Sequence, residues 1–427
     1  MRLKYRWVVG LMLFLASVIC YIDRSSLSIV APMITRELHV QPAMLGVLFS
    51  GFFLSYSFGG LFTGYAVDWF SQKRFLSVSM IIWSIFCGLT AVATSFTQLM
   101  SFRIVFGLAE SPINSLTTKM VRTWFPRDEV GTAMGATLPG GSQIGAAVAG
   151  PVIGIAAATF GWRASFVVVM IVGVVWTLIW MLLVTDRPSQ SRFVKPEELA
   201  EIADEINLPP RPADEDVRPL LYYAKSPAVL ATASSLFASN YVLYFLLTWL
   251  PSYLVDVRHL DIKTMGILIA LPWVVGALGC VGGGLIADWL LRVTRKPILC
   301  RTIIVVVGLS GAAAALFLTM VVGSLTGVMI LLAFANFTLH FVPGSVWVIL
   351  GELVPSIRLG TASGYVTCLA NLSGIVGPAM TGFIIQYGGG YGSSFVLAGM
   401  VAVCSTLAVI IFVRAPVGAH APAATRP

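Results

Sequence analysis

The run Trp7–Thr35, WVVGLMLFLASVICYIDRSSLSIVAPMIT, decides the fold class of this chain. A helix crosses a bilayer with about 20 apolar residues, so the run is long enough for one crossing. It carries Asp23 and Arg24 side by side near its middle. A charge near the bilayer centre costs at least ~2.5–3.5 kcal/mol on insertion scales, which makes such a residue a functional-site hypothesis. The run therefore predicts a membrane helix whose centre handles charge.

The composition extends this prediction to the whole chain. Of its 427 residues, 57% are hydrophobic and only 11% are charged, against about 25% charged in soluble domains. We therefore expect an all-α membrane protein without a separate soluble domain. The six cysteines form no C-x-x-C pair, so we predict no metal site, no disulfide framework and no cofactor.

Apolar segments separated by short polar stretches predict twelve transmembrane helices in two six-helix bundles. We expect an N-terminal bundle over 1–185, a cytoplasmic linker over 186–226 and a C-terminal bundle with a short tail over 227–427. In the linker, 196–206 is expected to form a surface helix with Leu199, Ile202 and Ile206 facing the membrane. The predicted spans are 7–35, 43–67, 74–95, 97–122, 131–158, 162–185, 227–254, 262–288, 297–321, 324–351, 359–386 and 392–413.

The distribution of Lys and Arg predicts the orientation. Four of the 27 fall in outer loops and two are intramembrane, which leaves 21 on the inner side if the N-terminus is inside. Both termini are therefore expected in the cytoplasm, with the protein in the cell inner (plasma) membrane. The net charge of +8 is then a topology signal and does not indicate nucleic-acid binding. A monomer is the default expectation.

The two halves repeat each other. Gly64-Tyr-Ala-Val-Asp68 recurs as Gly284-Leu-Ile-Ala-Asp288, and Gly150-Pro151 recurs as Gly377-Pro378. The offsets of 220 and 227 are nearly constant. Such duplication is the usual build of secondary transporters.

A second charged pair lies in the segment Phe102–Val121. Arg103, Glu110 and Asn114 recur at i, i+7 and i+11 and share one helix face. We expect Asp23, Arg24, Arg103 and Glu110 to be the only charges deep inside apolar segments. One interpretation is a static charge clamp between two helices. The other is a site for an anion and a coupling proton.

The functional interpretation assigns a role to each charge. Guanidinium pairs with carboxylate bidentately, so Arg24 and Arg103 are predicted substrate ligands, with Tyr21 beside them. Asp23 and Glu110 are predicted proton carriers, because a substrate anion at a nearby Arg changes the proton affinity of the acid, and this coupling is reciprocal.

The second half offers neutral polar groups instead of central charges. Trp273 and Trp347 are candidates for stacking, and His340 is expected to be a packing residue. One further predicted substrate-binding residue, Gln143, comes from the glycine-rich fifth segment of the first half. The others are Asn240, Tyr241, Tyr244, Asn371 and Ser373.

The loop Gly64-x-x-x-Asp68-x-x-x-x-Lys73-Arg74 resembles the signature of the major facilitator superfamily. Tyr21-x-Asp23-Arg24, Gly107-Leu-Ala-Glu110-Ser-Pro112 and Trp124-Phe-Pro126-Arg-Asp-Glu129 resemble the anion:cation symporter family within it. The resemblance covers 7–413 and implies the major facilitator fold and the same roles for the four charges. The chain departs from the sugar-acid members at Ile113-Asn114, at Val130 and at Gly141.

The loop motif and its copy are expected to act as a conformational latch between the two halves. The alternative is simple anchoring by positive charge. The predicted latch residues are Gly64, Asp68, Lys73, Arg74, Asp288 and Arg292.

Together these features predict a proton-coupled transporter that imports an organic carboxylate by alternating access. Its expected partners are a small organic anion, protons and the lipid bilayer. A sugar acid, a small dicarboxylate and an aromatic acid all remain open as the substrate, and an anion exchanger or facilitator is the alternative mechanism. An enzyme is not expected, because no nucleophile–base constellation or metal cluster is visible.

Overall fold

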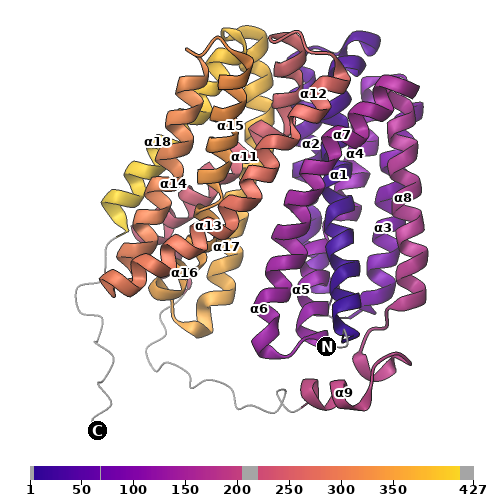
Figure 1. Ribbon diagram of the computed structural model, residues 1–427, viewed down its shortest axis with the longest axis vertical. Helices are drawn as coiled ribbons and strands as arrows, with labels where there is room; N and C mark the ends of the chain where they lie inside the picture. The colour runs from indigo at the N-terminus through magenta and orange to yellow at the C-terminus, as the bar shows by residue number, and fades with distance from the viewer. Residues whose placement is uncertain (1–3, 68, 204–219, 414–427) are drawn as a thin grey trace. The chain divides into compact units, whose positions relative to one another are not determined.

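The computed structural model describes residues 4–67, 69–203 and 220–413, and in these residues every regular element is a helix (Figure 1). Eleven helical segments among them are long and apolar enough to cross a membrane. They correspond to eleven of the twelve expected spans. The remaining span, expected over 97–122, is present as two shorter helices.

The chain forms two compact units that interleave along the sequence. The first comprises 1–211, 244–277 and 374–394, and the second comprises 212–243, 278–373 and 395–427. The boundaries cross several long helices, so parts of the C-terminal half belong to the first unit. The division into two bundles joined by a linker over 186–226 stays a prediction.

The first half of the chain supplies most helices of the first unit. Helices α1, α3 and α8 lie side by side, and α1 also packs along α7 (Figure 1). The elements are α1 (Arg6–Leu38), α2 (Pro42–Ala66), α3 (Gln72–Leu89), η1 (Thr90–Val92), α4 (Phe96–Glu110), α5 (Ile113–Trp124), α6 (Arg127–Gly135), η2 (Ala136–Gly140), α7 (Gly141–Phe160), α8 (Trp162–Leu183), η3 (Pro188–Gln190) and α9 (Pro196–Ala203).

The second half continues the all-helical pattern. In the second unit, α14 packs against α15 and α16. The elements are α10 (Leu220–Ala224), α11 (Pro227–Asp256), α12 (Ile262–Leu268), α13 (Ala270–Thr294), α14 (Pro297–Thr319), α15 (Leu325–Leu339), α16 (Val342–Leu353), α17 (Ser356–Tyr387) and α18 (Gly390–Phe412).

Prolines divide the fourth and tenth expected spans at corresponding places. The fourth ends as α4 at Glu110 and restarts as α5 after Pro112, and the tenth is divided between α15 and α16 just before Pro343. Proline has no backbone N–H and its ring clashes with the preceding turn, which explains both breaks. The first break follows directly after the predicted proton carrier Glu110.

Glycines let α7 approach α1 closely. A Cβ built on Gly145 would lie 2.5 Å from the carbonyl oxygen of Val18, and one built on Gly141 would lie 2.6 Å from the Cβ of Ser17. Small residues permit such contacts between membrane helices. This packing holds the charged middle of α1 against the glycine-rich helix α7.

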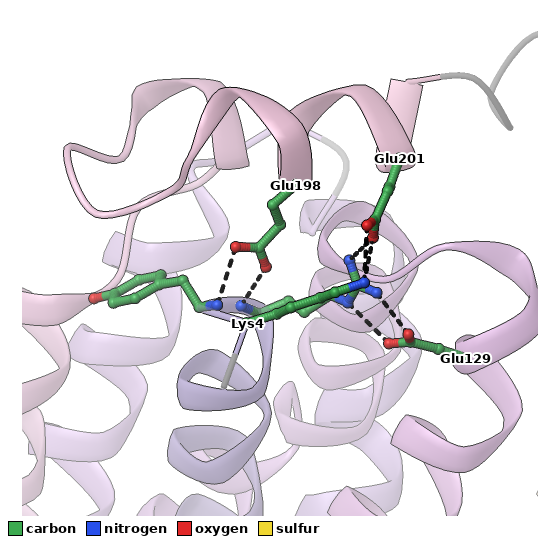
Figure 2. A network of polar contacts seen from close by, with 6 residues as sticks. Lys4, Glu129, Glu198 and Glu201 are labelled. Atoms are coloured by element: carbon green, nitrogen blue, oxygen red, sulfur yellow. Dashed lines mark hydrogen bonds and ion pairs between the residues drawn. The ribbon is translucent and has the colours of Figure 1, made fainter. Parts of the chain in front are cut away.

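Helix α9 docks on the first unit at the start of α1 (Figure 2). The carboxylate of Glu198 accepts hydrogen bonds from the backbone N–H groups of Tyr5 (3.0 Å) and Arg6 (2.9 Å), which caps the start of α1. The Arg6 guanidinium, 1% exposed, pairs with Glu129 at 2.5 Å and with Glu201 at 2.9 Å. The ion pair between Glu201 and the buried Arg6 side chain therefore holds α9 against the first unit.

The expected orientation of this linker helix is wrong. Ile202 is buried, and together with Leu199 it lines a pocket against Arg122 and Arg187 of the same unit. The acidic residues of α9 find basic and backbone partners at the start of α1, which turns its apolar residues onto protein and away from lipid. Ile206 lies outside the described residues.

Candidate functional site

An ion pair between α1 and α4 forms the centre of the candidate site. The Nε of Arg24 lies 2.5 Å from Oε1 of Glu110, and both side chains are buried. The thiol of Cys20, one turn earlier on α1, lies 2.9 Å from the same oxygen. The other carboxylate oxygen of Glu110 has no hydrogen-bond partner among the described residues. The pair predicted as ligand and proton carrier is thus in direct contact.

Aromatic rings enclose the guanidinium of Arg24. Its Cζ lies 4.5 Å from the ring centroid of Tyr56, 5.1 Å from that of Tyr21 and 5.3 Å from that of Phe52. Cation–π attraction strengthens when the cation is removed from water. The rings therefore hold Arg24 in a fixed place without neutralising its charge.

Asp23 and Arg103 interact electrostatically but form no ion pair within 4.0 Å. Asp23 is fully buried and interacts with the indole of Trp83 and with the charge of Arg103. Within the described part of the chain, neither of its carboxylate oxygens has a hydrogen-bond partner of ordinary geometry, and neither do Nε and Nη2 of Arg103. Buried polar groups are nearly always hydrogen-bonded, so these atoms require an explanation.

The four charges balance to zero in the buried interior of the first unit. Placing them there unpaired would be costly, and among these four described side chains only Arg24 and Glu110 form an ion pair within 4.0 Å. A static clamp would be expected to satisfy all four side chains. Among the described residues the ion pair joins Arg24 to Glu110 and leaves Asp23 and Arg103 outside it.

Two of the other predicted ligands also lie in this unit. Gln143 is buried on α7. Tyr244 on α11 is 9% exposed, and its ring centroid lies 4.3 Å from that of Phe53. Electrostatic interaction links Tyr244 to Arg24 and to Glu110, which places it near the central ion pair.

The remaining predicted ligands belong to the second unit. Tyr241 and Ser373 are buried there, and Asn240 and Asn371 are half-buried. His340 places Nδ1 2.7 Å from the carbonyl oxygen of Asn336, as a packing residue would.

The predicted latch residues make local contacts. The backbone N–H of Lys73 donates to Asp186 at 2.8 Å, and that of Arg74 donates to the Ser71 hydroxyl at 3.2 Å, so both lie in the capped first turn of α3. Asp288 pairs with Arg301 at 3.0 Å.

The other predicted latch positions are Arg292, Gly64 and Asp68. Arg292 has no ion pair among the described residues, Gly64 lies in α2, and Asp68 lies outside the described residues.

Sequence reasoning missed several residues of the site. Tyr56, Phe52, Cys20 and Trp83 surround the four charges, but in an apolar helix they resemble ordinary core residues. Phe52 and Tyr56 stand four residues apart, and this spacing could have indicated that their rings share one face of the helix.

A further charge, Lys119, lies in the predicted span 97–122 but away from its centre, and the statement that only four charges fall deep inside apolar segments stays a prediction. Lys119 lies in α5, beyond the deep charges of the same predicted span, and its Nζ donates to the carbonyl oxygen of Val67 at 3.0 Å. It stands near the end of an apolar run, beside Arg122.

Comparison with known proteins gives a consistent result. The model of the Major Facilitator Superfamily matches residues 13–378. The chain is 38% identical over 417 residues to a hexuronate transporter of Bacillus subtilis (strain 168), covering 97% of this chain and 96% of that one. It is 30% identical over 410 residues to a probable L-galactonate transporter of Escherichia coli (strain K12), covering 95% and 89%.

A solved structure agrees on the fold. A bacterial homologue of the human lysosomal transporter Spinster, in an inward-facing and unoccupied conformation, aligns with a TM-score of 0.77 over 97% of this chain and 98% of that one, at 20% identity. The predicted fold class is confirmed, and these relatives are transporters, not enzymes. The chain belongs to the Major Facilitator Superfamily and, within it, to the anion:cation symporter family.

Proposed function

We propose that the protein imports an organic carboxylate together with protons, by alternating access. The observation that carries the proposal is the buried Arg24–Glu110 pair. Beside it, the carboxylate oxygens of Asp23 and the Nε and Nη2 of Arg103 have no hydrogen-bond partner of ordinary geometry among the described residues. The names of the relatives, a hexuronate transporter and a probable L-galactonate transporter, favour a sugar acid as the substrate class.

Substrate recognition centres on the two arginines. The carboxylate of the substrate displaces Glu110 from Arg24, whose guanidinium plane is already fixed by the rings of Tyr21 and Tyr56. Arg103 offers further charged donors to the same anion. The residues proposed to hydrogen-bond the remainder of the substrate are Gln143, Asn240, Tyr241, Tyr244, Asn371 and Ser373.

Proton coupling follows from this exchange of partners. A Glu110 released from Arg24 becomes an unpaired buried carboxylate, which is costly unless it takes up a proton. Substrate binding and protonation therefore favour each other, and linkage makes the effect reciprocal. Asp23 is the second carrier, because its carboxylate is already buried without a hydrogen bond of ordinary geometry from the described residues.

The free energy available to drive uptake depends on how many protons enter with each substrate molecule. One pH unit supplies about 1.4 kcal/mol per proton. The membrane potential supplies ~2.3 kcal/mol per net charge per 100 mV. Import of a monoanion with two protons would use both terms, since one positive charge moves inward with each cycle.

The remaining assignments complete the proposed carrier. The protein lies in the cell inner membrane as a monomer, with both termini in the cytoplasm. The loop motif and its copy act as the latch between conformations, through the residues Gly64, Asp68, Lys73, Arg74, Asp288 and Arg292.

Uptake into proteoliposomes tests the proposal. Radiolabelled D-glucuronate is offered with an inward proton gradient, with the gradient collapsed by a protonophore, and with an inside-negative potential alone. Accumulation above the external concentration only when a gradient is present supports symport. Equilibration that ignores the gradient supports a facilitator, and uptake only against internal anion supports an exchanger. A panel of dicarboxylates and aromatic acids identifies the substrate if D-glucuronate fails.

A further inference from the structure

Helix α5 presents a polar face that the central site does not use. One side of the helix is buried in the first unit through Ile113, Leu116, Met120, Val121 and Trp124. The opposite side carries only polar and basic residues, and Asn114 and Arg122 on it are exposed. Polar residues within membrane segments face the bundle interior or a water-filled cavity. This face is therefore suited to an aqueous path.

A pocket of about 520 Å³ lies on this face. Such a volume falls in the range of small-molecule sites, ~300–1,000 Å³. Its described lining contains two cations and no carboxylate. The lining residues are Val67, Asn114, Ser115, Thr118, Lys119, Arg122 and Thr123.

The two cations have different surroundings. The Nζ of Lys119 donates to the carbonyl oxygen of Val67 at 3.0 Å, which anchors its ammonium group at the wall of the pocket. Arg122 is exposed and makes no hydrogen bond or ion pair with the part of the chain that the structure describes. Its planar guanidinium is thus available for bidentate pairing with a carboxylate.

One side chain that lines the pocket is hydrogen-bonded to an aromatic residue of the central site. Asn114 lies four residues after Glu110, and its Nδ2 donates at 3.0 Å to the hydroxyl of Tyr56, the same ring that lies 4.5 Å from the Arg24 guanidinium. Arg122 lies eight residues after Asn114 in α5, which is ~12 Å along the helix at 1.5 Å per residue. The polar face therefore leads away from Arg24 through Asn114, Thr118 and Arg122, which follow one another at successive turns of α5.

We propose that this pocket is a second binding site for the transported carboxylate, between the central charges and the cytoplasm, with Arg122 as its ligand. The proposal rests on the proposed function, which supplies the substrate class. Lys119 adds positive charge, and Asn114 and Thr118 offer hydrogen bonds to hydroxyl groups. A substrate that moves there leaves Arg24, which then pairs with Glu110 again.

Labelling at position 118 tests the site directly. The variant Arg24→Ala/Thr118→Cys removes the central ligand and places a thiol in the pocket. It is treated in nanodiscs with an anionic sulfonate-bearing methanethiosulfonate or a cationic one, and modification of that position is followed by mass spectrometry. Because a positively charged cleft raises the local concentration of anions about tenfold or more, the anionic reagent should react faster than the cationic one.

Protection identifies the ligand. Millimolar D-glucuronate should slow the anionic reagent several-fold, whereas glucose, which has no carboxylate, should not. Adding Arg122→Gln should abolish both the charge preference and the protection. Adding Arg192→Gln, an arginine that stacks on Phe193 outside the pocket, should preserve both.

The outcomes separate this proposal from the proposed function. If the wild-type protein accumulates D-glucuronate but position 118 is not protected, the second site is wrong and the symport proposal stands. The second site is also wrong if Arg122→Gln leaves protection unchanged. If protection depends on Arg122 but the wild-type protein accumulates neither D-glucuronate nor any acid of the panel when a proton gradient is present, the pocket stands as a carboxylate site and the symport proposal fails.

Discussion

Arg24 on α1 and Glu110 on α4 meet at 2.5 Å, Nε to Oε1, and α4 ends at that glutamate. The proline break that follows separates α4 from α5. The carboxylate therefore sits where one helix stops and a second, more polar helix begins. Among the described residues, this position gives it one fixed cationic partner and leaves one carboxylate oxygen without a partner.

Replacing Arg24 with Ala should abolish measurable substrate binding. Truncating one member of a buried charge pair costs about 2–5 kcal/mol, or roughly 30-fold to several thousand-fold in affinity. Isothermal titration of the purified variant with the transported acid measures this loss. Arg163→Ala is the matched control, since it removes a half-exposed arginine that pairs with Glu37 and should leave affinity unchanged. Normal binding by Arg24→Ala would show that Arg24 is not a ligand.

Replacing Glu110 with Gln should separate exchange from accumulation. The amide oxygen still accepts a hydrogen bond from Arg24, but the side chain no longer takes up a proton. Counterflow of labelled substrate against internal unlabelled substrate should therefore persist, while proton-driven accumulation falls to equilibration. Glu37→Gln, at a half-exposed glutamate paired with Arg163, should change neither measurement. Full accumulation by Glu110→Gln would leave Asp23 as the only remaining candidate carrier of the pair.

The four central charges were predictable because any charge within an apolar run stands out. Their pairing was not, since the sequence does not say that Glu110 meets Arg24 while Asp23 turns towards Trp83. The enclosing rings were not predictable either, because an aromatic residue such as Tyr56 is as common in a packing interface as in a site.

The prediction of the helix boundaries was limited by the positions of two prolines. Pro112 and Pro343 interrupt spans that hydropathy alone treats as continuous. The docking of α9 could not be predicted, because it depends on the partners that Glu198 and Glu201 find nearly 200 residues away.

Docking of α9 should weaken at acidic pH. Hydrogen bonds from Lys4 and Arg6 hold the pKa of Glu201 below its ordinary value. A lowered carboxyl pKa stabilises the docked helix above the ordinary pKa of about 4.3, and this contribution is lost as the pH falls through the lowered value. Hydrogen exchange of residues 196–203, corrected for intrinsic rates, should therefore show less protection below pH ~4 than at neutral pH.

Two variants identify the groups responsible for this docking. Glu201→Gln should reduce the protection of α9 several-fold at neutral pH and flatten its pH dependence, because Lys4 and Arg6 lose their charged acceptor. Glu197→Gln, an exposed carboxylate on the same helix, is the control and should behave as wild type. If Glu201→Gln keeps full protection, the capping of α1 by Glu198 alone holds the helix.

Gly150 should tolerate no larger residue. A Cβ at this position would meet the carbonyl oxygen of Gly266 and the side chain of Ile269, where α7 packs against α12 within the first unit. Overpacking of this kind costs about 1–3 kcal/mol, so Gly150→Val should lower the melting temperature of the purified protein. Gly135→Ala is the matched control. No described atom lies within 4 Å of a Cβ built there, and the higher helix propensity of Ala, worth about 0.5–1 kcal/mol, should leave the melting temperature equal or slightly raised. An unchanged melting temperature for Gly150→Val would mean that α7 and α12 can separate at no cost, and that their contact does not stabilise this conformation.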